Sequence, residues 1–250
     1  MSGRKKDRLD LLLVERGLAE TRNKAQALIM SGTVLVNDVP AEKPGMAVDS
    51  NSEIRLKKQP KNYVSRGGDK LEGALAHFEI DPSGQVVVDL GASTGGFSDC
   101  LLRRGVIKIY AVDVGTNQLH YSLRQDERIV SLENTHARDL ARCNFSPKPS
   151  LGVVDVSFIS LRKVLPFLVP EMAHEFEIIA LVKPQFELGK EHIESGGVVR
   201  DLKKQKLAVD LVEQYCRECG LSFRGSVASV KTGAKKGNQE YFVLISNSDE

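Results

Sequence analysis

Apolar residues follow two different spacings along this chain of 250 residues. Near the amino terminus, residues 9–13 and 25–29 repeat apolar side chains every three or four positions, which is typical of helices with one buried face. Thr21 stands where it can cap the second of these helices. Residues 34–36 and 54–56 then alternate as short strands. The first 60 residues therefore predict a small α+β domain.

From residue 61 onward, helical stretches alternate with continuous apolar runs. Such runs are typical of strands that are covered on both faces. A helix is expected over 70–78, and the two last strands, 223–230 and 241–245, have no helix between them. The earlier strands are expected at 86–88, 107–112, 129–130, 151–156 and 178–182. The pattern predicts an α/β, Rossmann-like fold with a mostly parallel sheet and a terminal antiparallel hairpin. A polar, basic segment around Pro60 predicts the boundary between domains 1–60 and 61–250.

Charge is uneven between these two domains. The whole chain has a net charge of +2, but residues 1–61 contain 12 basic and 8 acidic residues. A basic module in front of a near-neutral body favours RNA docking, although a merely solubilising amino terminus has the same composition. Hydrophobic residues make up 41% of the chain, and no apolar run approaches the roughly 20 residues of a membrane span. We therefore expect a cytoplasmic protein with no membrane partner.

The four cysteines do not indicate a metal site. Cys216 and Cys219 form a Cys-x-x-Cys pair within an apparent amphipathic helix, without a second pair or a histidine cluster nearby. A zinc or redox role is therefore not expected, and the cysteine usage fits a reducing compartment.

The amino-terminal motifs resemble those of a known RNA-binding domain. The segments are Arg8-Leu9-Asp10, Arg16-Gly17, Thr21 to Ala25 and Ser31 to Asn37. They are similar to the small domain named after ribosomal protein S-four, with Thr21 where a serine is usual. The resemblance implies that basic side chains of two helices contact structured RNA, and lysine and arginine bind phosphates without reading sequence. The candidates are Arg4, Lys5, Lys6, Arg8, Arg22 and Lys24.

A glycine-rich turn follows the first strand of the second domain. Its spacing, G-x-x-x-G-G, differs from the G-x-G-x-x-G of dinucleotide-binding proteins. Asp113 ends the next strand, where a carboxylate can bind ribose hydroxyls. Asp139 and Leu140 follow the third strand and are expected to flank an adenine. The turn itself comprises Gly91, Ala92, Ser93, Thr94, Gly95, Gly96 and Phe97. Together with the terminal hairpin, these residues favour S-adenosylmethionine (SAM) as cofactor, with NAD as the alternative.

Two lysines and two carboxylates complete the pattern. Asp155 and Lys183 come at the ends of the fourth and fifth strands, Glu240 opens the last strand, and Lys70 begins the helix before the first. Carboxyl ends of parallel strands line the ligand crevice. Burial and a neighbouring cation lower the pKa of a lysine, so one of two adjacent lysines can act as a base for a hydroxyl. We expect these four residues to be catalytic.

Residues 61–246 resemble the FtsJ-type ribose methyltransferases with their Lys-Asp-Lys-Glu tetrad, and nearly the whole chain resembles the TlyA family, often labelled haemolysin. The matching segments are Tyr63 to Leu71, Gly91 to Phe97, Val182 to Glu187 and Gly237 to Glu240. Val230 departs from the family, where a proline is common. The resemblance implies that Lys183 is the general base, that the acceptor is the 2′-oxygen of cytidine, and that ribosomal RNA or ribosomal subunits are the partner.

Two further segments are candidates for RNA contact. Residues 189–200 are expected to form a lid, and Lys231, Lys235 and Lys236 give a basic loop near Glu240. Both segments could also be plain surface loops. Three other functions stay open at this point: a haemolysin-like membrane-active protein, a ribosome-associated RNA-binding factor without methyl transfer, and a nucleotide-dependent dehydrogenase.

Overall fold

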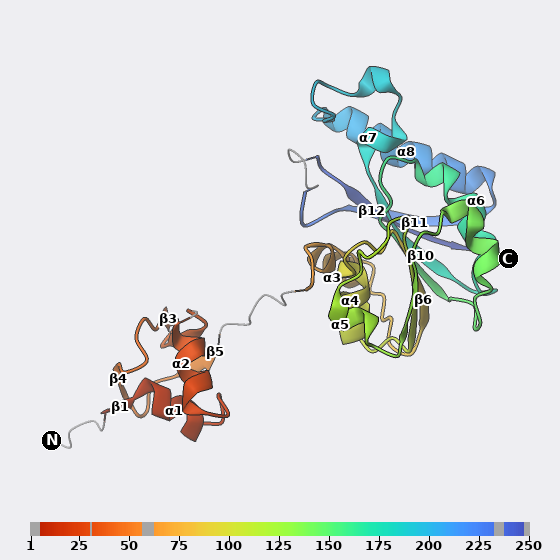
Figure 1. Ribbon diagram of the computed structural model, residues 1–250. Helices are drawn as coiled ribbons and strands as arrows, with labels where there is room; N and C mark the ends of the chain where they lie inside the picture. The colour runs from red at the N-terminus through yellow and green to blue at the C-terminus, as the bar shows by residue number, and fades with distance from the viewer. Residues whose placement is uncertain (1–5, 31, 57–62, 233–237, 248–250) are drawn as a thin grey trace. The chain divides into compact units, whose positions relative to one another are not determined.

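A computed structural model describes residues 6–30, 32–56, 63–232 and 238–247 of the chain. The structure divides into two compact units, residues 1–62 and residues 63–250 (Figure 1). Each unit has its own hydrophobic core, and each is described by itself below.

The first unit packs two helices against short antiparallel strands. Leu9, Leu13 and Ile29 are buried in its core, as their spacing predicts. Thr21 caps the second helix, because its hydroxyl accepts a hydrogen bond from the Lys24 N–H at 3.3 Å. The elements are β1 (Lys6–Arg8), α1 (Leu9–Glu15), α2 (Arg22–Met30), β2 (Val34–Val36), β3 (Val39–Pro40), β4 (Ala47–Asp49) and β5 (Ile54–Leu56).

In this unit β2 pairs with β3 and β5, and β1 pairs with β4. The pair β1–β4 was not predicted. Each of its strands is three residues long, and their sequences, KDR and AVD, are too short and too polar to show an alternation.

The second unit is built on one sheet of seven strands. The strands are β6 (Val86–Leu90), β7 (Lys108–Val112), β8 (Ile129–Leu132), β9 (Leu151–Val154), β10 (Glu177–Val182), β11 (Leu221–Ala228) and β12 (Tyr241–Asn247). The α-helices are α3 (Gly67–His77), α4 (Gly96–Arg103), α5 (Tyr121–Arg124), α6 (Leu165–Leu168), α7 (Pro184–Glu187) and α8 (Leu202–Glu218). The 3-10 helices are η1 (Ala137–Cys143), η2 (Leu161–Lys163), η3 (Val169–Glu171) and η4 (Lys190–His192).

The strand order is β11-β12-β10-β9-β6-β7-β8. The five strands from β10 to β8 are parallel, and β12 is antiparallel to both β10 and β11. The expected parallel sheet with a terminal antiparallel hairpin is therefore confirmed. All five residues of β6 are buried, because this strand lies at the centre of the sheet with helices on both faces.

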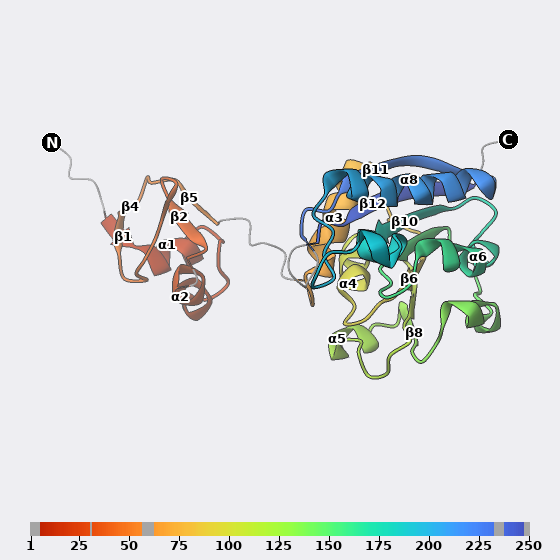
Figure 2. The same ribbon diagram turned by 90° about the horizontal axis from the view of Figure 1, so that it is seen from above.

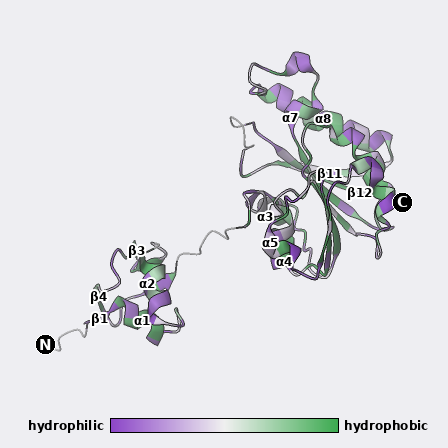
Figure 3. Ribbon diagram, in the orientation of Figure 1, coloured by the Kyte–Doolittle hydropathy of each residue, from purple (hydrophilic) through white to green (hydrophobic). Residues whose placement is uncertain are grey.

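Helices cover the two faces of the sheet in separate groups (Figures 1 and 2). Helices α6 and α8 pack on one face with Val243 and Ile245, and α3, α4 and α5 pack on the other with Phe242. In Figure 3 the strands are largely hydrophobic, whereas α8 alternates hydrophobic and hydrophilic residues along its length. This alternation is expected for a helix with one buried face.

Most strands differ from the expected bounds by one or two residues at an end, and the differences at α3, β9 and β11 bear on the candidate site. Helix α3 begins at Gly67, so Lys70 lies within its first turn. Strand β9 ends at Val154, where its pairing with Leu90 ends, and Asp155 follows directly. Strand β11 begins at Leu221 and ends at Ala228, with an irregular register near Gly225.

Asp89 is a fully buried carboxylate of β6 beneath the start of α4. The Ser98 hydroxyl donates a hydrogen bond to its Oδ2 atom at 2.7 Å, whereas Oδ1 has no hydrogen-bond partner among the described residues. Burial raises the pKa of Asp89 to about 7, the hydrogen bonds from Ser98 oppose this, and the negative charges of Asp155 and Asp113 add to it.

The raised pKa of Asp89 predicts a pH-dependent stability. The folded state holds this proton more strongly than the unfolded chain, in which an aspartate has a pKa of about 4. The penalty of ionising Asp89 is therefore absent below about pH 4 and is complete above about pH 7. We expect Asp89→Asn to gain stability relative to the wild type across this window, by up to about 1.4 kcal/mol per pH unit. Chemical denaturation at several pH values measures this, and a difference that does not change with pH would contradict it.

Candidate active site

The carboxyl edge of the parallel sheet brings together the four residues that the sequence singles out. Asp155 follows β9, and Lys183 follows β10. Glu240 directly precedes β12, whose first residue, Tyr241, pairs with Val182 at the end of β10. Lys70 reaches the same place from the first turn of α3. Residues separated by as many as 170 positions thus meet at one point.

These residues form two lysine–carboxylate pairs. The Nζ atom of Lys70 donates to Oε2 of Glu240 at 2.5 Å, and the Nζ atom of Lys183 lies 2.6 Å from Oδ1 of Asp155. The second contact is short, but its angles do not fit a hydrogen bond. Oδ1 of Asp155 therefore has no hydrogen-bond partner among the described residues. We treat it as an ion pair, since charge attraction depends on distance far more than on alignment.

Burial differs within the two pairs. The side chains of Lys70, Lys183 and Glu240 are only 5–11% exposed, and that of Asp155 is 24% exposed. A buried charge is costly unless it is paired, so each carboxylate stabilises the lysine that it contacts. The greater exposure of Asp155 leaves the Lys183 pair open to the adjoining cavity.

A cavity of about 620 Å³ contains all four side chains. This volume is within the range of small-molecule sites. Its wall also includes Gly91 and Ser93 of the glycine-rich turn, so the turn and the two pairs share one space. A connected hollow of about 210 Å³ is lined by Lys70, Asp155 and residues of the turn, including Ala92, Thr94, Gly96 and Phe97.

The turn requires glycine at specific points. Gly91 and Gly95 have φ angles of +89° and +92°, which side chains rarely adopt. A Cβ atom on Gly91 would lie 2.5 Å from the carbonyl oxygen of Asp155. A Cβ atom on Gly96 would lie 2.2 Å from the hydroxyl of Ser65. The backbone of the turn therefore lies close to that of Asp155 and to the side chain of Ser65.

Asp113 lies on the other side of this turn. Its two carboxylate oxygens accept hydrogen bonds from the N–H groups of Ser93 and Gly115, at 2.8 and 2.7 Å. It lines a third cavity, of about 520 Å³, together with Gly91 and Asp155. The wall of this cavity is largely apolar and includes Leu90, Val112, Val114, Val156 and Ile159.

The residues expected to flank an adenine are placed differently. Leu140 is fully buried in the core of the unit, and Asp139 pairs with Arg138 and Arg142. Neither lines the third cavity, which is bounded instead by Thr135, His136 and Ala137. The chain turns into η1 at Ala137, and this turn carries the next residues away from the cavity.

Ser157 and Phe158, which follow Asp155 in the sequence, also belong to the site, although they were not predicted. The hydroxyl of Ser157 accepts a hydrogen bond from Nζ of Lys183 at 2.9 Å. Phe158 is 86% exposed, has a φ of +65°, and packs against Phe186 with ring centroids 5.1 Å apart. A strained, exposed aromatic side chain beside the cavity of the two lysine–carboxylate pairs is a candidate contact for a planar ligand. The sequence signal was available, since Ser157 and Phe158 directly follow the strand expected over residues 151–156.

Glu187 and Asn238 hold neighbouring segments of the chain in place through hydrogen bonds. Glu187 is buried and accepts hydrogen bonds from the Ser160 hydroxyl at 2.5 Å and the Leu161 N–H at 2.7 Å; burial raises its pKa. The amide of Asn238 accepts from the Val199 N–H and donates to the Gly197 carbonyl, both at 2.9 Å. These bonds fix the segments that follow β9 and α7.

Two of the candidate RNA-binding residues of the first unit belong to one cluster. Arg8 and Arg22 both contact the buried Asp10, and Lys24 pairs with Glu20. Lys6 lies in β1. Arg4, Lys5, Lys235 and Lys236 lie outside the described residues. Residues 189–200 border the 620 Å³ cavity through Ile193, Gly196 and Gly197.

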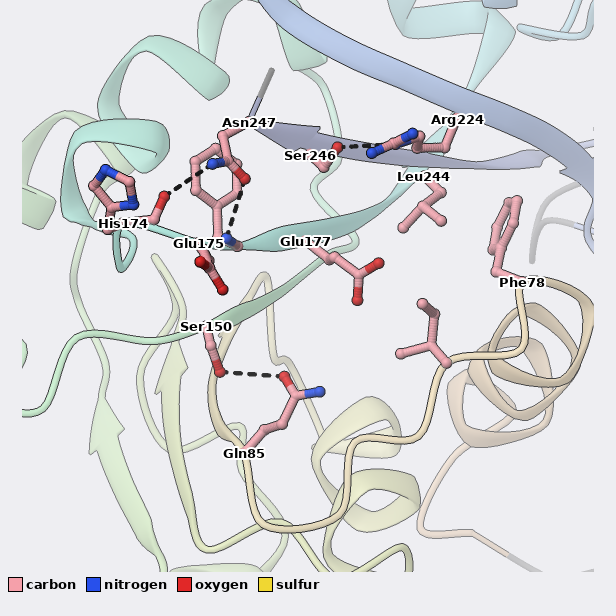
Figure 4. A pocket seen from close by; sticks show the side chains of 12 residues that line it. Phe78, Gln85, Ser150, His174, Glu175, Glu177, Arg224, Leu244, Ser246 and Asn247 are labelled. Atoms are coloured by element: carbon pink, nitrogen blue, oxygen red, sulfur yellow. Dashed lines mark hydrogen bonds between the residues drawn. The ribbon is translucent and has the colours of Figure 1, made fainter. Parts of the chain in front are cut away.

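A larger hollow, of about 1010 Å³, lies at the opposite edge of the sheet (Figure 4). It is open, and its polar side chains largely bind each other: Ser150 donates to Gln85, and Arg224 donates to Ser246. Glu175 and Glu177 both line it, but its lining residues include no lysine that could pair with them as at the other edge of the sheet. Size alone therefore does not mark the reactive site of this protein.

Two features are absent from the part of the chain that the structure describes. None of its helices is both long enough and apolar enough to cross a membrane. It also holds no group of three or more histidine, cysteine and acidic side chains that could bind a metal ion.

Comparison with known proteins identifies both units. Residues 63–247 match the family described as FtsJ-like methyltransferase, and residues 7–54 match the S4 domain. The chain is 43% identical to the 16S/23S rRNA (cytidine-2'-O)-methyltransferase TlyA of Mycobacterium tuberculosis over 239 residues, which cover 95% of this chain and 89% of that protein.

Proteins called hemolysin are also similar to the chain. Hemolysin A of Brachyspira hyodysenteriae is 40% identical, over 94% of this chain and 97% of that protein. A Streptococcus thermophilus structure described as a hemolysin has a TM-score of 0.73 at 39% identity, over 99% of this chain and 90% of that one. With a family match that spans about three quarters of its length and relatives at this level of identity, the chain belongs to the FtsJ-like methyltransferases and, within them, to the TlyA family.

Proposed function

We propose that this protein transfers a methyl group from SAM to a ribose 2′-hydroxyl of ribosomal RNA, with cytidine as the acceptor nucleoside. The observation that carries the proposal is the meeting of two lysine–carboxylate pairs in one cavity with the glycine-rich turn. The relative from Mycobacterium tuberculosis, whose name states this activity on cytidine, supports the choice of acceptor.

The residues around the turn fit SAM. Gly91 lets the turn approach the backbone of Asp155, where a Cβ atom would lie 2.5 Å from the carbonyl oxygen, and the adjoining cavity of about 520 Å³ has apolar walls and is also lined by Asp113. Apolar walls suit an adenine ring, and a carboxylate at a strand end suits ribose hydroxyls. When bound, SAM supplies a methyl group activated by a positively charged sulfur.

Lys183 is the proposed general base. In its amine form, Nζ accepts the proton of the 2′-hydroxyl while the ribose oxygen bonds to the methyl carbon and the sulfur keeps the electrons of the breaking bond. Asp155 and Ser157 hold this nitrogen from two sides. Lys70, held by Glu240, lies at the same cavity, where its ammonium group stabilises charge on the attacking oxygen.

Phe158 offers a surface for the acceptor nucleoside. Its ring is exposed and borders both the cavity of the two lysines and the apolar cavity beside Asp113. Stacking on an aromatic ring holds an unpaired base without hydrogen bonds. Methyl transfer to a ribose needs that nucleoside in a fixed place, since alignment of the attack lowers the barrier.

Removal of the proposed base tests the function directly. We expect Lys183→Ala to lower kcat by about 10²–10⁴-fold, because proton transfer by a positioned base contributes that much. The measurement is transfer of radiolabelled methyl from SAM to purified ribosomal subunits and to naked ribosomal RNA. The product should resist alkali, because a methylated 2′-oxygen can no longer attack the neighbouring phosphate.

The matched control for this experiment is SAM binding by the same variant. Lys183→Ala should bind SAM within about threefold of the wild type, since its defect lies in the chemical step. If the wild type binds SAM but labels no ribosomal RNA, the acceptor is wrong. If the variant retains full activity, Lys183 is not the base.

Ser157 provides a second and finer test. We expect Ser157→Ala to lower kcat about three- to tenfold with little change in KM, because it removes one hydrogen bond that orients Nζ of Lys183. Ser157→Thr keeps the hydroxyl and should recover most of the activity. Steady-state methyl transfer measures both variants, and equal losses for alanine and threonine would show that packing, not the hydroxyl, matters at this position.

A further inference from the structure

Asp10 is the centre of a polar cluster in the first unit. It lies in the first turn of α1, and its side chain is fully buried. Arg8 donates two hydrogen bonds to it, from Nε at 3.0 Å and from Nη2 at 2.9 Å. Arg22 Nε and Gln26 Nε2 each donate to Oδ2 at 3.0 Å. The Arg8 guanidinium, with help from Gln26 and Arg22, holds the pKa of Asp10 well below its usual range.

This carboxylate brings two guanidinium groups together. Arg8 precedes α1, and Arg22 begins α2, so the two come from different elements. Both donate to the same oxygen of Asp10, and two donor atoms that share one acceptor lie within about 6 Å of each other. Two cations at this separation repel, and the buried negative charge between them offsets the repulsion. The cluster retains one net positive charge.

The outer surfaces of both arginines stay accessible. Their side chains are 48% and 51% exposed, although their inner edges bind Asp10. A guanidinium has five N–H donors, and Asp10 occupies only part of each set. The backbone of Gly45 lies against the Arg8 guanidinium, where a Cβ atom would be 3.4 Å away. The two hydrogen bonds to Asp10 fix the plane of the Arg8 guanidinium.

We propose that Asp10 is a positioning residue that holds Arg8 and Arg22 as one preformed receptor for an RNA phosphate group. The inference rests on RNA being the substrate of the proposed function. Planar guanidinium forks match the oxygens of a phosphate, and a fork that is already fixed loses less side-chain entropy on binding.

A purely structural or neutralising role for Asp10 predicts a different result. If Asp10 only cancelled one positive charge, its removal would strengthen the attraction to RNA. If Asp10 positions the arginines, its removal weakens binding even though the net positive charge rises. The two roles therefore give changes of opposite sign.

The test uses the full chain and the nearly isosteric variant Asp10→Asn. We expect its affinity for a ribosomal RNA fragment to fall about tenfold, and KM for RNA to rise by a similar factor, with kcat unchanged. In the background Arg8→Gln/Arg22→Gln, Asp10→Asn should cost no further affinity, because Asp10 acts through the two arginines. Equal or tighter binding by Asp10→Asn, or an additive loss in that background, overturns the inference.

Two controls separate positioning from charge and folding. Arg55, which pairs with Asp38, is another exposed arginine of this unit. Arg55→Gln removes one positive charge, as the change of either Arg8 or Arg22 to glutamine does, and should change the affinity less than twofold. Arg8→Lys/Arg22→Lys keeps both charges and Asp10 but loses the planar forks, so it should lose about as much affinity as Asp10→Asn. This double variant decides the question if Asp10→Asn unfolds the unit, as thermal unfolding would reveal.

Failure of this inference and failure of the proposed function give different experimental results. RNA binding that depends on Asp10, without methyl transfer by the wild type, would leave the inference standing and remove the proposed function. Vesicles of anionic phospholipid serve as the other phosphate source. Binding that depends on Asp10 for vesicles but not for RNA would overturn the inference in favour of a membrane surface.

Discussion

Two buried lysine–carboxylate pairs at the carboxyl edge of the sheet are the interaction on which the methyltransferase unit depends. A lysine taken out of water is stable as a cation only with an opposite charge beside it, and each pair supplies that charge. The partners come from four separate segments, so no local stretch of chain can form either pair. The parallel order of β6, β9 and β10, with the antiparallel β12, brings them to one edge. The sheet therefore positions the chemistry as well as forming the core.

Three carboxylates near the carboxyl ends of the strands have different roles because their surroundings differ. Asp89, two residues before the glycine-rich turn begins at Gly91, is fully buried, and burial raises its pKa. Glu187 is also buried, but its carboxylate oxygens accept hydrogen bonds from the segment that follows β9. Asp155 remains open to the cavity beside Lys183. Burial and hydrogen-bond partners, rather than residue type, decide which carboxylate is available to pair with a lysine.

The amino-terminal unit applies the same physical rule to a different task. Asp10 is buried and holds two arginines, but the arginines keep half of their surface exposed. In the catalytic unit, paired charges are enclosed, which suits proton transfer away from bulk water. In the amino-terminal unit, paired charges face outward, which suits contact with phosphate groups. Internal ion pairs thus fix the geometry of both units.

The sequence alone determined the fold class, the order of the strands along the chain and the four residues of the tetrad. Periodic spacing and strand-end positions are local signals, and they placed Lys70, Asp155, Lys183 and Glu240 near the ends of elements. The tertiary structure decided which lysine pairs with which carboxylate, since that depends on the order β12-β10-β9-β6. It also decided that Ser157 holds Lys183, that Asp139 and Leu140 turn away from the apolar cavity, and that Asp10 joins two arginines. Such contacts depend on distances between segments far apart in the chain, and periodicity carries no information about those distances.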